Sequence, residues 1–166
     1  MNMVNVTIDD VQVSVPSNFT VLEAARKAGI NIPTLCYLKG INEVGACRLC
    51  LVEVVGGRAL AAACVNPVTD GMIVKTNSNR VRATRRSTLE MILSDHNREC
   101  LSCIRNKNCE LQDMAERYNI RQVTFEGKKS EPKIDDKSQS LFRDASKCIL
   151  CGRCVAACEK QSIGVL

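Results

Sequence analysis

Cysteine is the residue type that dominates the chemistry available to this chain. Eleven cysteines and a single histidine occur among 166 residues, and their spacing sorts them into three groups of four. The groups are Cys36, Cys47, Cys50 and Cys64; His96, Cys100, Cys103 and Cys109; and Cys148, Cys151, Cys154 and Cys158. Thiolates and imidazoles bind transition metals, and an iron–sulfur cluster usually takes four protein ligands. The count therefore predicts three clusters. A chain with three such redox centres would be suited to electron transfer.

The first group contains a close pair, Cys47 and Cys50, which lets one loop present two thiolates to the same centre. Gly45 and Ala46 precede the pair and keep side chains small where the backbone would wrap a metal core. The interval from Cys36 to Cys47 is longer than the corresponding interval of plant-type ferredoxins. The pattern indicates a 2Fe–2S cluster. Zinc or a purely structural role stays open, because zinc ribbons use the same pair.

The second group is the only one that includes a histidine. An isolated histidine is more often a bystander than a ligand, but His96 stands four residues before Cys100 and two further cysteines follow. An imidazole in place of a thiolate removes one negative charge and tends to raise a cluster's potential. We expect a 4Fe–4S cluster here. A zinc site with three cysteines and one histidine is the physical competitor.

The third group has the spacing of the bacterial ferredoxin run, whose fourth cysteine normally ligates the other cluster of a pair. Glu159 follows Cys158 where proline is usual, and the sequence ends at Leu166 before a second run. Three interpretations are open. Cys158 completes a single 4Fe–4S cluster, a residue of a partner protein completes that cluster, or the chain is part of a longer protein. We favour the first possibility, because twelve ligands then fill three sites.

Composition limits the functional classes. Aromatic residues make up 3% of the chain and tryptophan is absent, so metals are expected to supply cohesion that a small core lacks. The formal net charge is +5. Oxidised clusters with four thiolates carry about two negative charges each, and one with a histidine about one, which offsets that excess. Net charge therefore gives no case for a nucleic-acid partner.

The location of the protein also follows from its residues. The first ten residues reach acidic side chains before any apolar core of a signal peptide could form. No window approaches the roughly 18 apolar residues that a membrane span needs. We therefore expect a cytoplasmic protein without a membrane span, in which reduced cysteines serve as metal ligands.

Residues 1–78 are predicted to form a β-rich unit, whose elements position the cysteines of the first group. Alternating residues over 4–8 and 11–15 predict a hairpin. A capping box at Thr20 and Glu23 predicts a helix over 24–28 that ends at Gly29. A second hairpin is expected from 51–55 and 58–62 around Gly56 and Gly57. Residues 72–76 are expected to form a last strand.

The character of the chain changes after this unit. We expect helices over 79–95, 110–117 and 152–159, each beside a ligand group. Residues 126–140 are charged and are predicted to be an exposed linker. The predicted domains are therefore a 2Fe–2S ferredoxin-like domain (1–78), a 4Fe–4S domain with one histidine and three cysteines (79–125), the linker, and a 4Fe–4S ferredoxin-type segment (141–166).

A basic stretch lies on the first of these helices. It consists of Arg80, Arg82, Arg85 and Arg86. The plain interpretation is a solvated helix face, and the sharper one is a docking surface for an acidic partner.

Several stretches resemble a known iron–sulfur module. They are PTLCY (33–37), GACRLCLVEV (45–54), AACVNPV (62–68), RRSTLEMILSDHNRECLSC (85–103) and CELQ (109–112). The module is similar to the N-terminal region of iron-only hydrogenase large subunits and to the large iron–sulfur subunit of respiratory complex I. The resemblance implies an α+β fold that opens with a β-grasp 2Fe–2S domain and continues into small, mostly helical 4Fe–4S segments. It also implies one 2Fe–2S cluster on the first group and 4Fe–4S clusters on the other two, with the fourth ligand of the third cluster lying far downstream.

The resemblance also implies a function. We expect an electron-transfer subunit without catalytic residues of its own. It would relay electrons between a flavin- and NADH-binding subunit and another partner, either ferredoxin or a further iron–sulfur or flavoprotein subunit, in an oxidoreductase complex of the kind that includes electron-bifurcating ones. An alternative is a fragment or subunit of an iron-only hydrogenase. A more distant alternative is a zinc-stabilised module that binds nucleic acid.

Overall fold

The computed structural model describes residues 2–125, 129, 134–139 and 142–161. The fold is α+β, as the sequence predicted. The chain divides into two compact units, one made of Met1–Arg85 with Gly152–Leu166 and the other of Arg86–Cys151. The boundary between residues 85 and 86 falls inside one continuous helix. The boundary between residues 151 and 152 falls inside the third group of cysteines.

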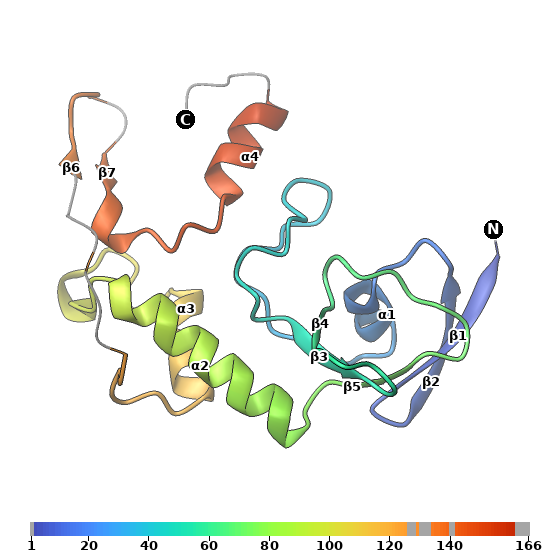
Figure 1. Ribbon diagram of the computed structural model, residues 1–166. Helices are drawn as coiled ribbons and strands as arrows, with labels where there is room; N and C mark the ends of the chain where they lie inside the picture. Colours follow the sequence, from blue (N-terminus) through green and yellow to red (C-terminus); the bar gives the residue numbers. More distant parts are fainter. Residues whose placement is uncertain (1, 126–128, 130–133, 140–141, 162–166) are drawn as a thin grey trace. The chain divides into compact units, whose positions relative to one another are not determined.

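A mixed five-stranded sheet is the frame of the first unit (Figure 1). Its strands, in spatial order, are β2 (Val11–Pro16), β1 (Met3–Ile8), β5 (Ile73–Lys75), β3 (Leu51–Val54) and β4 (Ala61–Ala62). The central pair, β1 and β5, is parallel, and every other pair is antiparallel. The last strand of the domain is thus inserted between the first hairpin and the strand that follows Cys50.

The predicted first hairpin is confirmed. Asp9 and Asp10 form the turn with φ angles of 46° and 68°, a left-handed conformation that aspartate tolerates better than most residues. Since side chains alternate across a strand, one face of the hairpin carries buried apolar residues. Val6, Ile8 and Val15 are at most 1% exposed and belong to the hydrophobic core.

The predicted helix after the hairpin is α1 (Val21–Lys27). The Thr20 hydroxyl accepts a hydrogen bond from the Glu23 backbone N–H, and the Glu23 carboxylate accepts one from the Thr20 backbone N–H. This reciprocal capping box satisfies two N–H groups that the first turn leaves without helical partners. Val21, Leu22, Ala24 and Ala25 are buried in the core of the sheet domain.

Three predicted strands are shorter in the structure than the sequence suggested. β3 ends at Val54, and the return strand of the second hairpin keeps only Ala61 and Ala62, which pair with Val52 and Leu51. The last strand ends at Lys75, because the Thr76 backbone N–H turns aside to donate to the Asp9 carboxylate at 2.7 Å. The strands beside the first cysteine group are therefore held by only a few ladder positions.

The second unit has two helices and little strand. It begins within α2 (Asn79–Asp95), continues through a 3-10 turn, η1 (Cys100–Ser102), and reaches α3 (Glu110–Arg117). Both helices have the bounds that the sequence predicted. Each helix carries a buried leucine: Leu89 in α2 is fully buried, and Leu111 in α3 is 4% exposed.

The remaining elements are short. Part of the predicted linker (126–128, 130–133 and 140) lies outside the described residues. Its exposed described part contains β6 (Ile134–Asp135), which pairs with β7 (Arg143–Asp144) in a minimal hairpin. A 3-10 turn, η2 (Ala145–Lys147), follows in the same unit. The predicted last helix is α4 (Arg153–Lys160), which belongs to the first unit.

Helix length and composition also bear on the predicted absence of a membrane span. Over the part of the chain that the structure describes, no helix is both long and apolar enough to cross a bilayer.

Candidate metal centres

The first cysteine group is built against the core of the sheet domain. Cys36 lies in the long loop after α1, Cys50 immediately precedes β3, and Cys64 follows β4. These three side chains are no more than 2% exposed, and Cys47 is half-buried. Antiparallel pairing of β3 with β4 brings the segments of Cys50 and Cys64 together, and the Ala63 backbone N–H donates to the Cys50 carbonyl at 3.1 Å.

The four thiols of this group converge. The Cys47 backbone N–H donates to Cys36 Sγ at 3.4 Å. The sulfur atoms of Cys50 and Cys64 are 3.3 Å apart. Gly45 completes the loop with a φ of +66°, and a Cβ atom at this position would lie 3.8 Å from Cys64 Sγ and 3.3 Å from the Val65 side chain. A side chain at Gly45 would therefore be strained by the positive φ and would press on Val65, next to Cys64.

Proximity changes the acidity of the paired thiols. A hydrogen bond with the Cys64 thiol lowers the pKa of Cys50 to about 6. The same hydrogen bond, together with burial and the neighbouring Cys50 charge, raises the pKa of Cys64. Burial raises the pKa of Cys36 as well. One thiolate thus forms readily, and a full set of four needs a positive charge at its centre, as a metal core provides.

A buried asparagine shapes the loop that carries Cys36. Asn42 is 3% exposed, and its side-chain amide donates to the Cys36 carbonyl at 2.8 Å. Within the same unit, α4 contacts this loop, because Arg153 donates to the Tyr37 carbonyl at 3.2 Å. Asn42 was not among the predicted site residues. The only feature of the sequence that could have indicated its role was its place in a loop between two predicted ligands.

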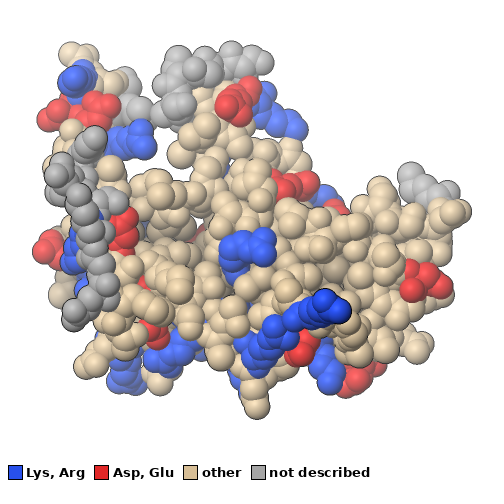
Figure 2. Space-filling view, viewed as in Figure 1, with Lys and Arg blue, Asp and Glu red and all other residues tan. Residues whose placement is uncertain are grey.

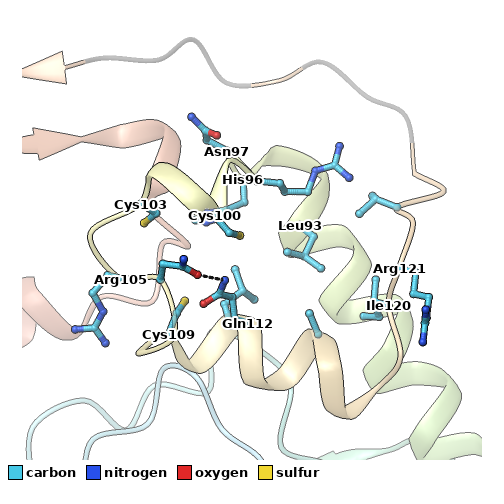
Figure 3. Close-up of a pocket in the computed structure, with 15 residues that line it drawn as sticks. Leu93, His96, Asn97, Cys100, Cys103, Arg105, Cys109, Gln112, Ile120 and Arg121 are labelled. Carbon is cyan, nitrogen blue, oxygen red and sulfur yellow. Dashed lines mark hydrogen bonds between the residues drawn. The ribbon is translucent and has the colours of Figure 1, made fainter.

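The second group lies in the second unit, around a cavity of about 180 Å³. Its members follow α2, occupy the η1 turn and its end, and immediately precede α3. They are His96, Cys100, Cys103 and Cys109, and all four line the cavity (Figure 3). Apolar side chains such as Leu93 and Ile120, together with polar ones such as Gln112, form the rest of its wall. The space greatly exceeds the roughly 30 Å³ that one water occupies in the liquid.

His96 presents an unused ring nitrogen at this site. Its Nδ1 atom is buried and has no hydrogen-bond partner, although buried polar atoms are nearly always paired. Burial, reinforced by the charge of Lys147, lowers the pKa of the imidazole. The ring is therefore neutral near pH 7, with a lone pair available to bind a metal.

Cys109 occupies the N-cap position of α3 and makes no side-chain capping hydrogen bond. Its sulfur is thus placed at the positive end of the dipole of α3.

Gln112 was not among the predicted site residues, but it supports the loop between Cys103 and Cys109. The Gln112 amide donates to Asn106 Oδ1 at 3.0 Å, and its carbonyl oxygen accepts from the Lys107 backbone N–H at 3.0 Å. Lys107 has a φ of 62°, a conformation that costs a non-glycine residue roughly 1 kcal/mol. Gln112 therefore stabilises a strained turn between Cys103 and Cys109 (Figure 3).

The third group is divided between the two units. Cys148, which is exposed, and Cys151, which is half-buried, belong to the second unit. Cys154, also exposed, and Cys158, which is 9% exposed, lie on α4 in the first unit. Gly152 caps α4 with a φ of 76°. The assignment of these four residues to one cluster stays a prediction.

The geometry bears on the choice between a single metal ion and a larger core. Among residues 2–125, 129, 134–139 and 142–161, no three His, Cys, Asp or Glu side chains are arranged to hold one ion. A zinc ion would need four such atoms within about 2.0–2.3 Å of one point. Eight candidate ligands nevertheless gather at two places, with a buried nitrogen unpaired at one of them. This arrangement fits iron–sulfur cores, whose ligands are spread over several irons.

Arginines of the basic stretch have distinct environments. Arg80 and Arg82 are exposed, as a solvated face requires. Arg86 pairs with Glu90 at 3.0 Å. Arg85 is 3% exposed and donates two hydrogen bonds to the Leu51 carbonyl, at 3.1 Å from Nε and 2.6 Å from Nη2. The sequence interpretation of a uniformly solvated face is therefore wrong for Arg85.

Three protein-family models match successive parts of the chain. A 2Fe-2S iron-sulfur cluster binding domain matches residues 1–79. The NADH-ubiquinone oxidoreductase-G iron-sulfur binding region matches residues 85–124. A 4Fe-4S binding domain matches residues 141–163. Together the models cover most of the chain.

Three curated proteins are similar over nearly the whole chain. NADP-reducing hydrogenase subunit HndD of Solidesulfovibrio fructosivorans is 48% identical over 172 residues, which cover all of this chain and 29% of the relative. An NADH-quinone oxidoreductase subunit of Rhizobium meliloti is 40% identical over 95% of this chain and 19% of its own length. Iron hydrogenase 1 of Clostridium pasteurianum is 37% identical over 96% of this chain and 28% of its own length. The chain thus spans less than a third of each of these relatives.

A solved structure matches more evenly. A chain of the crystal structure of NAD+-reducing [NiFe]-hydrogenase in the H2-reduced state superimposes with a TM-score of 0.92 and 34% identity, over 98% of this chain and 69% of the matched one.

Proposed function

Because this chain belongs to the iron–sulfur protein family that includes the matched chain of NAD+-reducing [NiFe]-hydrogenase and the aligned regions of the NADP-reducing hydrogenase and NADH-quinone oxidoreductase subunits, we propose that it relays electrons within a multi-subunit oxidoreductase. The relay connects a flavin- and NADH-binding partner with a second redox partner, either ferredoxin or another iron–sulfur or flavoprotein subunit. The chain itself contributes ligands and no catalytic residue.

The observation that carries the proposal is the gathering of eight candidate ligands at two places. The first group would hold a 2Fe–2S cluster and the second a 4Fe–4S cluster that uses His96. The third group would hold a further 4Fe–4S cluster with Cys158 as its fourth ligand. Such clusters supply one-electron transfer at potentials set by ligands, hydrogen bonds and solvent exposure.

The residues of the chain determine how each site accepts its charge. The buried thiols beside the sheet core exclude water from the first site. The helix end at Cys109 and the neutral His96 favour binding at the second site. With the proposed ligands, the first site has four thiolates, and the second has three thiolates and one imidazole. The two ligand sets therefore differ by one unit of charge.

The partners follow from the relatives. The names of the similar proteins include NAD+, NADP and NADH, and we extend a nicotinamide-linked partner to this chain. Electron bifurcation would take place at flavins of partner subunits, outside this chain. We also propose a cytoplasmic location, where thiols stay reduced and available as ligands.

Anaerobic purification tests the proposal. The protein should be brown and contain about ten irons per chain, from one two-iron and two four-iron clusters. Dithionite should generate separate 2Fe–2S and 4Fe–4S signals in electron paramagnetic resonance (EPR). A colourless protein that contains zinc would contradict the proposal, as would iron without acid-labile sulfide.

The hydrogenase alternative has a specific observation in its favour. Two of the three curated relatives have hydrogenase names, and this chain aligns with 29% and 28% of their lengths. Affinity purification of the chain under anaerobic conditions separates the alternatives. A co-purifying subunit with hydrogen uptake would support the hydrogenase assignment, and a flavoprotein without that activity would support the general relay.

A nucleic-acid-binding zinc module receives no comparable support. Lys and Arg side chains are mixed with Asp and Glu side chains on the face shown in Figure 2. Nucleic-acid sites commonly cluster basic residues on one face and stack bases on aromatic side chains. The chain has two tyrosines, three phenylalanines and no tryptophan.

A further inference from the structure

Arg85 is a buried arginine that contacts Leu51, the residue directly after Cys50 of the first group, and no part of the proposed ligand sets accounts for it. It lies in α2 within the first unit and is 3% exposed. Arginine keeps its charge in proteins, and burying a charge costs free energy unless other interactions compensate. A buried cation next to an electron-transfer site therefore calls for an electrostatic explanation.

The contact that Arg85 makes is determined by the way β3 is paired. The Cys50 carbonyl faces β4, where the Ala63 backbone N–H donates to it. Successive carbonyls of a strand point to opposite sides, so the Leu51 carbonyl faces the β5 side. β5 has already ended at Lys75, and its pairing with β3 involves only Glu53 and Val54.

Arg85 takes the place of the missing strand. Its Nε and Nη2 atoms donate to the Leu51 carbonyl at 3.1 and 2.6 Å. Leu51 is bonded directly to Cys50, whose thiol is 1% exposed. The guanidinium is therefore anchored to the residue that follows a ligand of the first site, on the protein side and away from bulk solvent.

This position has a consequence for the redox potential. When the first site gains an electron, its negative charge increases by one. A fixed cation in surroundings of low dielectric constant stabilises the more negative state. A bidentate anchor holds that cation in one place, so its effect does not depend on a mobile side chain.

On the basis of the proposed function, we propose that Arg85 is a positioning residue that raises the reduction potential of the 2Fe–2S site on Cys36, Cys47, Cys50 and Cys64, through its buried charge and its hydrogen bonds to the Leu51 carbonyl.

The same helix supplies a matched control. Arg82 lies three residues earlier and is exposed, and its contacts are with Asn77 and Asn79 rather than with β3. Replacement of either arginine by methionine removes one positive charge and keeps a long unbranched side chain. Only the Arg85 replacement removes that charge from the surroundings of the first site.

The experiment is a redox titration of the 2Fe–2S EPR signal in the full chain, purified anaerobically, at one pH and ionic strength. Arg85→Met should shift the midpoint potential to a lower value. Arg85→Lys, which keeps the charge but loses the fork of donors, should give a potential between those of Arg85→Met and the unchanged chain. Arg82→Met should leave the potential unchanged. The 4Fe–4S signals of the same samples serve as an internal reference.

Two results would overturn the inference. One is equal potentials in Arg85→Met, Arg85→Lys and Arg82→Met. The other is failure of both Arg85→Met and Arg85→Gln to take up a 2Fe–2S cluster that Arg85→Lys retains, since Arg85 would then be required for assembly rather than for the potential. If the unchanged chain gives no 2Fe–2S signal, the proposed function itself fails, and this outcome is distinguishable from the other two.

Discussion

The first and second metal centres are built by different means. The first has three ligands that are no more than 2% exposed, and two of them, Cys50 and Cys64, belong to the hydrophobic core of the sheet domain. The second lies among turns and helix ends, where Leu101 and Ile104, the neighbours of its cysteines, are 95% and 97% exposed. Core packing can hold the first site in shape without metal. The second site has few contacts besides its ligands.

This difference teaches where metal binding and folding are coupled. A site whose ligands flank paired strands of a packed sheet is largely formed before a metal arrives. A site whose ligands lie on successive turns gains its structure from the metal itself, as small metal-binding domains do. We therefore expect the two regions to respond differently to the same perturbation.

Removal of the metals should give the largest effect. After anaerobic treatment with a chelator, amide hydrogen exchange in residues 96–109 should approach the rate of an unstructured chain. Exchange in β1, β3 and α1 should remain slow, because the core residues of the sheet domain keep their contacts. Mass spectrometry of peptides from both regions measures the two rates in one sample.

A matched sample that is returned to iron and sulfide under the same conditions provides the control. Equal loss of protection in both regions would contradict the comparison, since it would mean that the sheet domain also depends on its metal to fold.

Substitution of a loop glycine tests the first region. Gly45→Ala and Gly29→Ala both place a side chain at a positive φ, +66° and +74°, at a cost of roughly 1–2 kcal/mol each. Only at Gly45 would the new Cβ press on Val65 and approach Cys64 Sγ. Gly45→Ala should therefore also change the visible absorption of the 2Fe–2S site, while Gly29→Ala should lower thermal stability without changing the spectrum.

Loss of a supporting side chain tests the second region. Gln112→Ala removes two hydrogen bonds that hold Asn106 and Lys107, and each is worth about 1 kcal/mol. The 4Fe–4S signal that depends on His96 should decay several times faster in air, with no change in the 2Fe–2S signal. Gln122→Ala, at an exposed position, is the control. Equal decay in both variants would show that Gln112 does not support the site.

The smallest effect concerns a carboxylate of the second region. A hydrogen bond from the Thr124 hydroxyl, and then the nearby Arg86, lowers the pKa of Glu90 below its ordinary value of 4.5. Glu90 thus stabilises the folded state above its unfolded pKa, and this contribution is lost as the pH falls through the folded pKa. Glu90→Gln should destabilise the chain at pH 7 and lose that effect progressively as the pH falls below 4.5 in denaturant titrations. A difference that persists at low pH would contradict this account.

Much of the local structure could be predicted from the sequence. The bounds of α2 and α3 agree with the prediction, as do the first hairpin and the capping box at Thr20. Such features depend on residues close together in the chain, whose periodicity and capping chemistry act locally. The resemblance to hydrogenase and complex I subunits is likewise confirmed, because metal-ligand spacing is itself a short-range pattern.

The long-range features could not be predicted in the same way. The insertion of β5 between β1 and β3 joins segments far apart in the chain. The early end of β5 and the burial of Arg85 follow from that arrangement. Arg85 has the same residue type as its exposed neighbours, and no local pattern distinguishes it.

The sequence by itself determined the kinds of ligands, their grouping and the helices and turns that carry them, because these properties are fixed by residue type and by spacing of a few positions. Only the tertiary structure decided which thiols are buried together, which nitrogen is left unpaired at His96 and which arginine is buried against Leu51. The reason is physical. Burial and electrostatic environment depend on which distant segments pack against a residue, and the strand order of the sheet sets that packing around the first site.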